Sequence, residues 1–451
     1  MNRIWVRFRD AQLQSPHCSK GASTCKSLKS GLDYLDPRFG SDRTGIVWIE
    51  KQQNDNNNAD GITVDPDDRL LIAGGHQAQF SLVRLTPHGM QDTTFGASGV
   101  VTGEFESGYK SKGHHTTVLK SGEILLSGFF SLEEYSNELA FALFDTTGSP
   151  VQAFGQKGVT VIRPFESVTV KPPEDFQSGV SVASPDSFSS ELPDGKLLVI
   201  SNQQFSYTER AGLLIRLNRD GSIDKEFGAE KKGYVYIRHP EYPTWIGSMI
   251  PLENGMFAVA GNAMVNARTT ALVAVYNADG TTFDGFGTNG FFLLNSIDEP
   301  SQISSLTLID NNILGIGSTL GGLRGTLLVC LDAKGESVKA FNGGKPVQTP
   351  VDDAPLGVQW LSGAVRKDGK IVAVGNTLGD QDSKTIIAQY LPDGQLDTNF
   401  GNERGLLRIN LTDVLDMGTA IAIQKNSQIV VAGSSLPING RRQGFVFRCL
   451  N

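Results

Sequence analysis

Seven copies of three short sequence markers constrain the fold of this chain more than any other feature. The first marker is Phe-Gly, the second is an apolar run ending in Gly or Ser, and the third is another apolar run beyond a variable loop. The phenylalanines of the first marker lie 55 to 73 residues apart, at Phe39, Phe95, Phe154, Phe227, Phe286, Phe341 (followed by Asn342 instead of glycine) and Phe400. This repetition indicates seven copies of one structural unit.

Each unit contains four strand candidates, which we name segments A to D. Segment A precedes a tight turn such as Asp194-Gly195, B follows that turn, C follows a variable loop, and D follows Phe-Gly. Segments B and C are almost continuously apolar, which is typical of strands covered on both faces, and no unit has the 3.6-residue period of a helix. The sequence therefore predicts an all-β fold, a seven-bladed β-propeller of four-stranded antiparallel blades.

The two ends of the repeat region carry complementary half-units. Asn451 directly follows a C segment, whereas residues 45–50 follow the first Phe-Gly and have no A, B or C segment before them. We expect this early D segment to complete the last blade and close the ring, which removes open sheet edges. The alternative is an open β-solenoid, which does not require complementary ends. Residues 31–451 are thus expected to form one propeller.

Residues 1–30 lie outside the repeat pattern. They carry six basic residues and one acidic residue, and we expect a disordered basic tail. Arginines interrupt the apolar residues of positions 1–10, so no classical signal peptide is expected, and no segment is long and apolar enough to span a membrane. These features favour a cytoplasmic location, with export by a non-classical route as the alternative.

Charge and cysteine content exclude further classes of protein. The chain has a net charge of -8 despite its basic tail, and an acidic body repels phosphate backbones, so we expect no nucleic-acid partner. Four cysteines in 451 residues do not make a disulfide framework. Cys330 and Cys449 occupy the same position two repeats apart, which is too far for a disulfide bond.

Several copies of the repeat resemble a known family. LDPRFG (residues 35–40), PDGK (193–196), ADG (278–280) and LPDGQLDTNFG (391–401) are similar to the delta-60 repeat, a bacterial β-propeller-type repeat. The resemblance covers residues 31–451. It implies the propeller architecture, and it supplies no common activity and no catalytic residues.

The loops divide into two groups that lie on opposite faces of a propeller. The A–B and C–D turns are short and alike, and we name their side the constant face. The B–C and D–A loops differ completely between units, and we name their side the variable face. Divergent loops on a rigid frame are where binding sites are usually built. We therefore expect ligands on the variable face, although unconstrained drift of the loops is an alternative explanation.

Two groups of residues are candidates for ligand binding on this face. His114 and His115 lie at the start of an inner strand, and with His76 and Asp60 of the preceding unit they can form a metal or anion site. The alternative is a polar cluster in a wet loop, and whether a metal binds is left open. Four aromatic residues can stack on sugar rings, anchor a protein partner, or simply cap the blade ends: Trp245, Trp360, Tyr207 and Tyr135.

Catalytic signals are scarce in this sequence. A propeller hydrolase needs carboxylates near its axis, but most inner segments contain none, and no GxSxG, CxxC or P-loop motif occurs. We therefore predict a non-catalytic binding propeller without a cofactor, with a protein ligand. A lectin-like, carbohydrate-binding propeller is the alternative, and a metal-dependent hydrolase is the third reading. The sequence does not indicate an oligomeric state.

Truncation tests the predicted ring closure. A protein comprising residues 31–451 should melt within a few degrees of the full chain, because the tail has no strand pattern. A 51–451 protein should aggregate, since losing several buried side chains at roughly 1.5–3 kcal/mol each removes much of a margin of about 5–15 kcal/mol. Thermal melting and solubility measure both effects. A soluble, cooperatively melting 51–451 protein would contradict closure and favour the solenoid.

Overall fold

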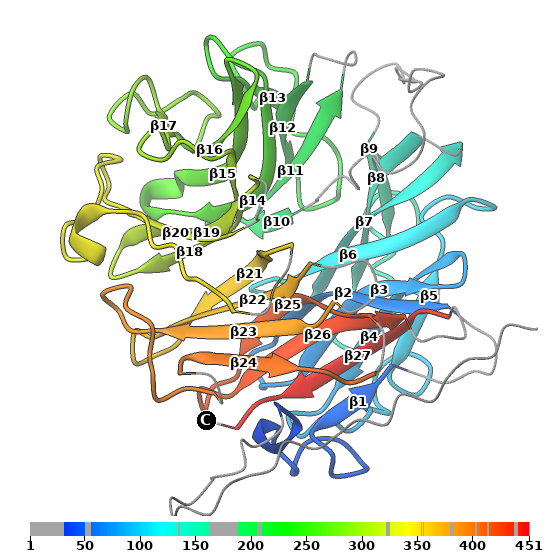
Figure 1. Ribbon diagram of the computed structural model, residues 1–451. Coiled ribbons are helices and arrows are strands. Elements are labelled where there is room, and N and C mark those ends of the chain that lie inside the picture. Colours follow the sequence, from blue (N-terminus) through cyan, green and yellow to red (C-terminus); the bar gives the residue numbers. More distant parts are fainter. Residues whose placement is uncertain are drawn as a thin grey trace, which may run out of the picture.

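The structure, a computed structural model, contains seven antiparallel sheets arranged as blades around a common centre (Figure 1). It describes residues 31–49, 56–133, 136–162, 188–204, 210–321, 325–352, 354, 356–378, 383–401, 404–412, 415–436 and 441–450. The predicted tail, residues 1–30, lies outside this part of the chain. Within it, no helix has the length and apolar character needed to cross a membrane.

The predicted segments A and B form the two strands of each blade that lie nearest the axis. Segment A forms the inner strands β2 (Asn57–Val64), β6 (Lys110–Val118), β10 (Phe188–Glu191), β14 (Thr244–Pro251), β18 (Ser301–Ile309), β21 (Val358–Val365) and β25 (Leu415–Ile423). Segment B forms β3 (Leu70–His76), β7 (Ile124–Glu133), β11 (Leu197–Gln204), β15 (Phe257–Val265), β19 (Asn312–Thr319), β22 (Ile371–Thr377) and β26 (Ile429–Leu436). Each inner strand contacts the inner strands of both neighbouring blades, so the ring is closed.

Segments C and D form the outer half of the blades. Segment C forms β4 (Gln79–Leu85), β8 (Ser136–Phe144), β12 (Arg210–Leu217), β16 (Arg268–Tyr276), β20 (Gly325–Leu331), β23 (Thr385–Tyr390) and β27 (Gln443–Arg448). Segment D forms β5 (Val100–Gly103), β9 (Val159–Ile162), β13 (Tyr234–Ile237), β17 (Phe291–Leu293), β24 (Leu406–Ile409) and β1 (Ile46–Trp48). Three short 3₁₀ turns complete the described elements: η1 (Gly31–Tyr34), η2 (Glu253–Gly255) and η3 (Asn342–Gly344).

The blades follow the chain, and we number them I to VII. Blade I contains β2–β5, blade II β6–β9, blade III β10–β13, blade IV β14–β17, blade V β18–β20, blade VI β21–β24, and blade VII β25–β27 with β1. The prediction of a seven-bladed propeller is confirmed. Blade V departs from four strands, because an isolated bridge between Leu328 and Val347 stands where the outer strand would be. This is the unit in which Asn342 replaces the glycine of Phe-Gly.

Ring closure by the early D segment is also confirmed. Strand β1 pairs antiparallel with β27, with Trp48 opposite Phe445 and Ile46 opposite Phe447. Their side chains join the apolar cluster between blades VI and VII. Cys449 lies in the same cluster, and both Cys330 and Cys449 are buried without a disulfide bond, as their spacing predicts.

The hydrophobic core lies between the blades, which explains the continuous apolar runs. On β3, Leu71 and Ala73 pack against blade II, whereas Leu70 and Ile72 pack against blade VII. Successive side chains of a strand point to opposite faces of its sheet, so both faces are covered and no polar alternation is needed.

The Phe-Gly marker forms a repeated contact on the constant face. The buried Phe227 ring packs against Gly280 in the C–D turn of the next blade, and a β-carbon at Gly280 would lie 2.8 Å from the ring. Gly280 also has a φ of +89°, which a residue with a side chain rarely adopts. Gly228 donates its N–H to the Asp279 carbonyl at 3.1 Å. The same ring-to-glycine contact joins Phe39 to Gly89, Phe95 to Gly148, Phe154 to Gly221, Phe286 to Gly335 and Phe341 to Gly394.

An Asp–Arg pair supports this contact in several blades. The buried Asp224 carboxylate accepts hydrogen bonds from Arg216 Nε at 2.6 Å and Lys196 Nζ at 2.8 Å. The Arg216 guanidinium lies 4.6 Å from the centre of the Phe227 ring and donates to the Ala278 carbonyl of the next blade. Comparable groups are Arg84 with Asp92, Phe95 and Thr146, and Arg448 with Asp36, Phe39 and Pro87.

Removal of one arginine should weaken a blade–blade contact. Arg216→Ala should lower the free energy of unfolding by about 2–4 kcal/mol, because Asp224 loses a buried partner and Phe227 loses its cation–π contact. Arg219→Ala, in the exposed turn nearby, should change it by less than about 0.5 kcal/mol. Denaturant titration measures both values. Equal effects would show that the Asp–Arg pair does not stabilise the blades.

Acid should destabilise blade VII, which closes the ring, by protonating Asp36. Burial raises the pKa of this carboxyl, but hydrogen bonds from Arg38 and the charge of Arg448 outweigh it and lower the pKa from 3.8 to about 2. A folded pKa below the unfolded value gives stability that is fully present above pH 3.8 and is lost as pH falls toward 2. Melting temperature between pH 7 and 2 should show this loss. Asp36→Asn should be less stable at pH 7 and less sensitive in that window, whereas an unchanged acid profile would contradict the assignment.

Candidate functional site

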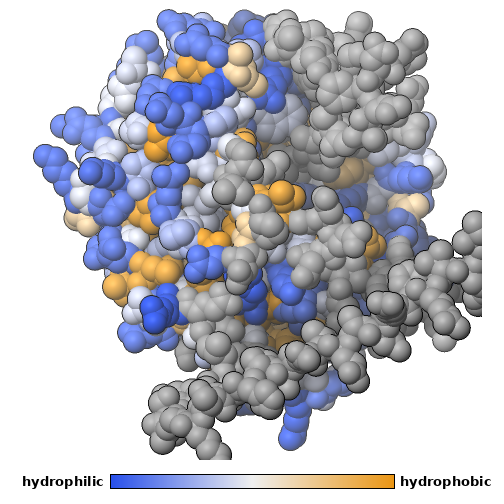
Figure 2. Space-filling view, in the orientation of Figure 1, coloured by the Kyte–Doolittle hydropathy of each residue, from blue (hydrophilic) through white to orange (hydrophobic). Residues whose placement is uncertain are grey.

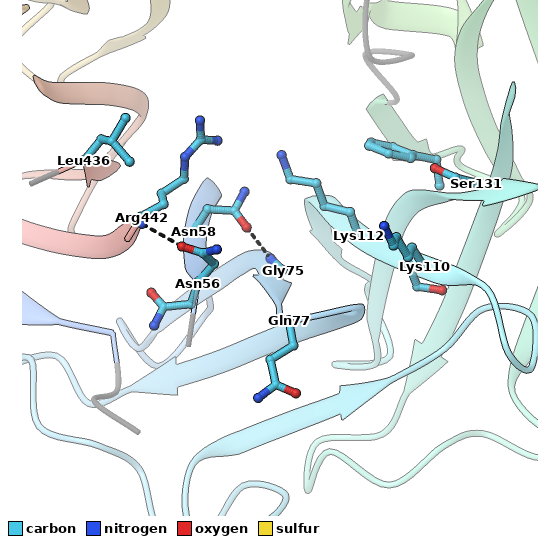
Figure 3. Close-up of a pocket in the computed structure, with 12 residues that line it drawn as sticks. Asn56, Asn58, Gly75, Gln77, Lys110, Lys112, Ser131, Leu436 and Arg442 are labelled. Atoms are coloured by element: carbon cyan, nitrogen blue, oxygen red, sulfur yellow. Dashed lines mark hydrogen bonds between the residues drawn. The ribbon is translucent and has the colours of Figure 1, made fainter. Parts of the chain in front are cut away.

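A polar cavity opens on the variable face where blades VII, I and II meet (Figure 3). Its volume is about 490 Å³, within the usual range for small-ligand sites. It is lined by the D–A and B–C sides of these blades: Asn56, Asn57, Asn58, Gly75, Gln77, Lys110, Ser111, Lys112, Phe129, Ser131, Leu436 and Arg442. Of the described lining residues three are cationic and none is acidic, in a chain whose net charge is -8.

A missing side chain explains why the cavity lies at this junction. After the second marker, most B strands carry a residue that binds the next inner strand. Asn202 exchanges hydrogen bonds with the Ile246 backbone, and Asn376 does the same with Gly418. Blade I has Gly75 at this position, so the space between blades I and II is left open. A β-carbon there would lie 2.9 Å from Asn58 Oδ1 and 3.4 Å from Lys112 Cγ.

One wall of the cavity is fixed by a network around Asp60. Lys112 Nζ lies 3.0 Å from Asp60 Oδ2, and Asn58 Nδ2 donates to the same oxygen. Asn58 Oδ1 accepts the Gly75 N–H at 2.8 Å. The side chains of Lys112 and Asp60 are 30% and 14% exposed, so solvent screens their attraction only in part. The charge of Lys112 is therefore balanced by Asp60.

Lys110 and Arg442 are the exposed cations of the cavity. Within the residues that the structure describes, neither side chain forms an ion pair. The Arg442 backbone is held against blade I: its N–H donates to Asn56 Oδ1 at 2.8 Å, and its carbonyl accepts the Asn57 N–H at 3.1 Å. In Figure 3 Arg442 enters from blade VII, and the two lysines enter from blade II on the other side. Within the described part of the chain, the cavity thus presents two positive charges without an ion-pair partner.

The four residues suggested for a metal or anion site have different surroundings in the structure. Across the described ranges, no group of three or more His, Cys, Asp or Glu side chains is placed to hold a metal ion. Asp60 binds Lys112 and Asn58, and His76 lies opposite Asn57 at the end of β3, beside the cavity residues Gly75 and Gln77. The metal and anion readings of this cluster both stay predictions, and the position of Asp60 and His76 beside a polar cavity is compatible with the anion reading.

The adjacent histidines pack toward blade III. His114 lies in a β-bulge of β6, at the position that Asp60 occupies in β2. The His115 ring lies 4.9 Å from that of Phe188, and no hydrogen-bond partner reaches its Nδ1 among the residues described. Burial, with the neighbouring His114, lowers the pKa of His115 to about 4. At neutral pH His115 is an uncharged packing residue.

The aromatic candidates have different environments. Trp360 is fully buried in the apolar cluster between blades V and VI, so its ring is not exposed to a ligand in this structure. Trp245 is half-buried at the start of β14, and the Arg210 guanidinium lies 5.5 Å from its ring centre. Tyr135 and Tyr207 lie outside the described residues.

Sequence reasoning missed the cationic lining residues. Lys110, Lys112 and Arg442 come from two blades that are distant in the chain, and no motif marks them. One signal was present, namely that Gly75 stands where other units have Asn, Ser or Phe. Figure 2 shows mostly hydrophilic residues on the described surface in its view, with apolar residues in scattered patches.

Comparisons with known proteins support the architecture. Residues 192–227 and 366–400 match a family described as a domain of unknown function (DUF5122) beta-propeller, a family of bacterial β-propeller repeats. These segments cover less than half of the chain. No curated protein sequence matches it.

Solved structures show similarity at low sequence identity. PQQ-bound aldose sugar dehydrogenase from Streptomyces coelicolor has 10% identity and a TM-score of 0.43, over 76% of this chain and 97% of that one. A PL25 polysaccharide lyase, ulvan lyase, has 10% identity and a TM-score of 0.40, over 84% and 91%. A protein of unknown function from Dyadobacter fermentans has 10% identity and a TM-score of 0.41, over 74% of this chain and 93% of that one. Matches at this level carry no functional argument.

Proposed function

We propose that this protein is a non-catalytic binding propeller whose ligand docks on the variable face and places a polar group in the cavity between blades VII, I and II. The observation that carries the proposal is the cavity itself, with three cationic side chains and several carboxamides in its lining. Its repeats resemble the delta-60 repeat, whose architecture accommodates such a site without a catalytic motif. In this reading residues 31–451 form the propeller, and residues 1–30 are an extension from it.

The arrangement of carboxylates supports binding rather than hydrolysis. General acid–base cleavage of glycosidic bonds uses two carboxyl groups facing the substrate. Among the described residues no acidic side chain lines the cavity, and Asp60 beside it is already bound to Lys112 and Asn58. These groups are arranged to neutralise and position one another.

A protein partner and a glycan both fit a site on this face, and one observation favours the glycan. A carboxamide offers a donor and an acceptor side by side, which suits the hydroxyl groups of a sugar. Asn56, Asn57, Asn58 and Gln77 line this concave site, and Asn56 Nδ2 has no partner within the described residues and can donate to a hydroxyl. Large exposed apolar side chains in the described part are dispersed, at Leu32, Met90, Tyr109, Leu308, Leu356 and Leu450.

Filling the cavity tests where the ligand docks. Gly75→Asn should displace Asn58 and occupy the space between blades I and II, because even a β-carbon approaches Asn58 Oδ1 within 2.9 Å. On a panel of immobilised neutral and acidic oligosaccharides and peptides, retained probes should bind the variant at least tenfold more weakly. Lys334→Ala, an exposed change on the constant face, should bind as the wild type does.

Two results would contradict the proposal. The first is a probe whose binding survives Gly75→Asn in a protein with unchanged melting temperature. The second is a change in the mass of a retained probe after incubation with the protein, which would indicate catalysis.

A further inference from the structure

We propose that the cavity recognises an anionic saccharide, with Lys110 and Arg442 binding its carboxylate or sulfate groups while Asn56 Nδ2 donates to a hydroxyl. This inference rests on the proposed function and names its ligand class. Its first basis is the charge of the side chains that line the cavity. Asp60 balances Lys112, so the positive charge left for a ligand comes from Lys110 and Arg442 on opposite sides of the opening (Figure 3).

The two cations are suited to an oxyanion for different reasons. Arg442 presents a planar guanidinium that matches the two oxygens of a carboxylate or sulfate. Its backbone is fixed to blade I by two hydrogen bonds, so the residue starts from a defined position. Lys110 lies at the start of β6 and contributes a flexible point charge. Each of these charges is available to an oxyanion of the ligand.

The remaining walls favour a sugar over an acidic peptide. Peptide ligands obtain much of their affinity from buried apolar anchors or from pairing with an open strand. Here the apolar lining residues are Leu436 and Phe129, and Phe129 is only 8% exposed. Asn56 Oδ1 accepts from Arg442, while its Nδ2 has no partner within the described residues and can donate to a hydroxyl. The lining thus combines polyol-binding groups with an anion site.

The net charge of the chain limits how acidic the ligand can be. The net charge of -8 repels a dense polyanion, whereas a short chain with spaced charges meets less repulsion. Attraction to an exposed site also weakens with salt, because the Debye length falls from about 10 Å at 0.1 M to about 3 Å at 1 M. Binding should therefore be salt-dependent.

Calorimetry with matched ligands tests the proposal on the full chain. The probes are an oligogalacturonate, its methyl ester, a sulfated oligosaccharide of similar length, a neutral oligosaccharide and an oligoglutamate peptide. The oligogalacturonate or the sulfated probe should bind, and which one binds identifies the oxyanion. The methyl ester, which keeps the sugar chain but lacks the charge, should bind at least tenfold more weakly than the free acid if the carboxylate is recognised.

Single variants test which cationic side chains bind the anionic saccharide. Lys110→Met and Arg442→Met should each weaken binding of the anionic saccharide about tenfold, since a charge-assisted hydrogen bond is lost. Lys367→Met, an exposed change on the constant face, should have no effect. Melting temperatures of all three should match the wild type, because none of these side chains is buried.

The outcomes separate this inference from the proposed function. Equal binding of a neutral and an anionic saccharide, or tighter binding of oligoglutamate, overturns the anionic-saccharide inference while Gly75→Asn still abolishes binding. Binding of an anionic saccharide that Lys110→Met and Arg442→Met leave unchanged also overturns it. Binding that is insensitive to Gly75→Asn overturns the proposed function as well.

Discussion

The contact between a buried phenylalanine and a glycine of the next blade, repeated at six blade junctions in the described part of the chain, is the constraint on which this structure depends. It determines why a Phe-Gly pair and a glycine-containing turn recur together, since the ring occupies the space that a β-carbon would need. Arg216 and its counterparts add charge to the same place by bridging a buried carboxylate, the ring and a carbonyl of the next blade. Fixing the blades on one face leaves the loops of the other face free to diverge.

The fold was predictable because its signals are local and repeated. The marker residues form turns, buried strands and blade–blade contacts within one unit or with the next, so their order in the sequence is their order in space. Even the closure of blade VII followed from complementary ends, and β1 lies beside β27. The lost outer strand of blade V was harder to predict, although Asn342 marked that unit as unusual.

The site was less predictable because it depends on the register of the strands and on the side chain that Gly75 lacks. Trp360 precedes a β-bulge in its inner strand, and one position decides whether a side chain points into the core or toward a loop. The cavity exists because Gly75 lacks the side chain that fills the same place elsewhere. Asp60 lies beside the cavity, but its partner Lys112 could not be inferred without the distances between strands.

Ring closure has a consequence for the timing of assembly. Arg442 is hydrogen-bonded to Asn56, which precedes it by 386 residues. During synthesis the blade I side of the cavity emerges from the ribosome first and must wait for the blade VII side, although most blades can already pack against their neighbours. A partly synthesised or opened ring therefore has blades but no complete cavity. Occupancy of the cavity would act as a check that the two distant parts of the polypeptide have met.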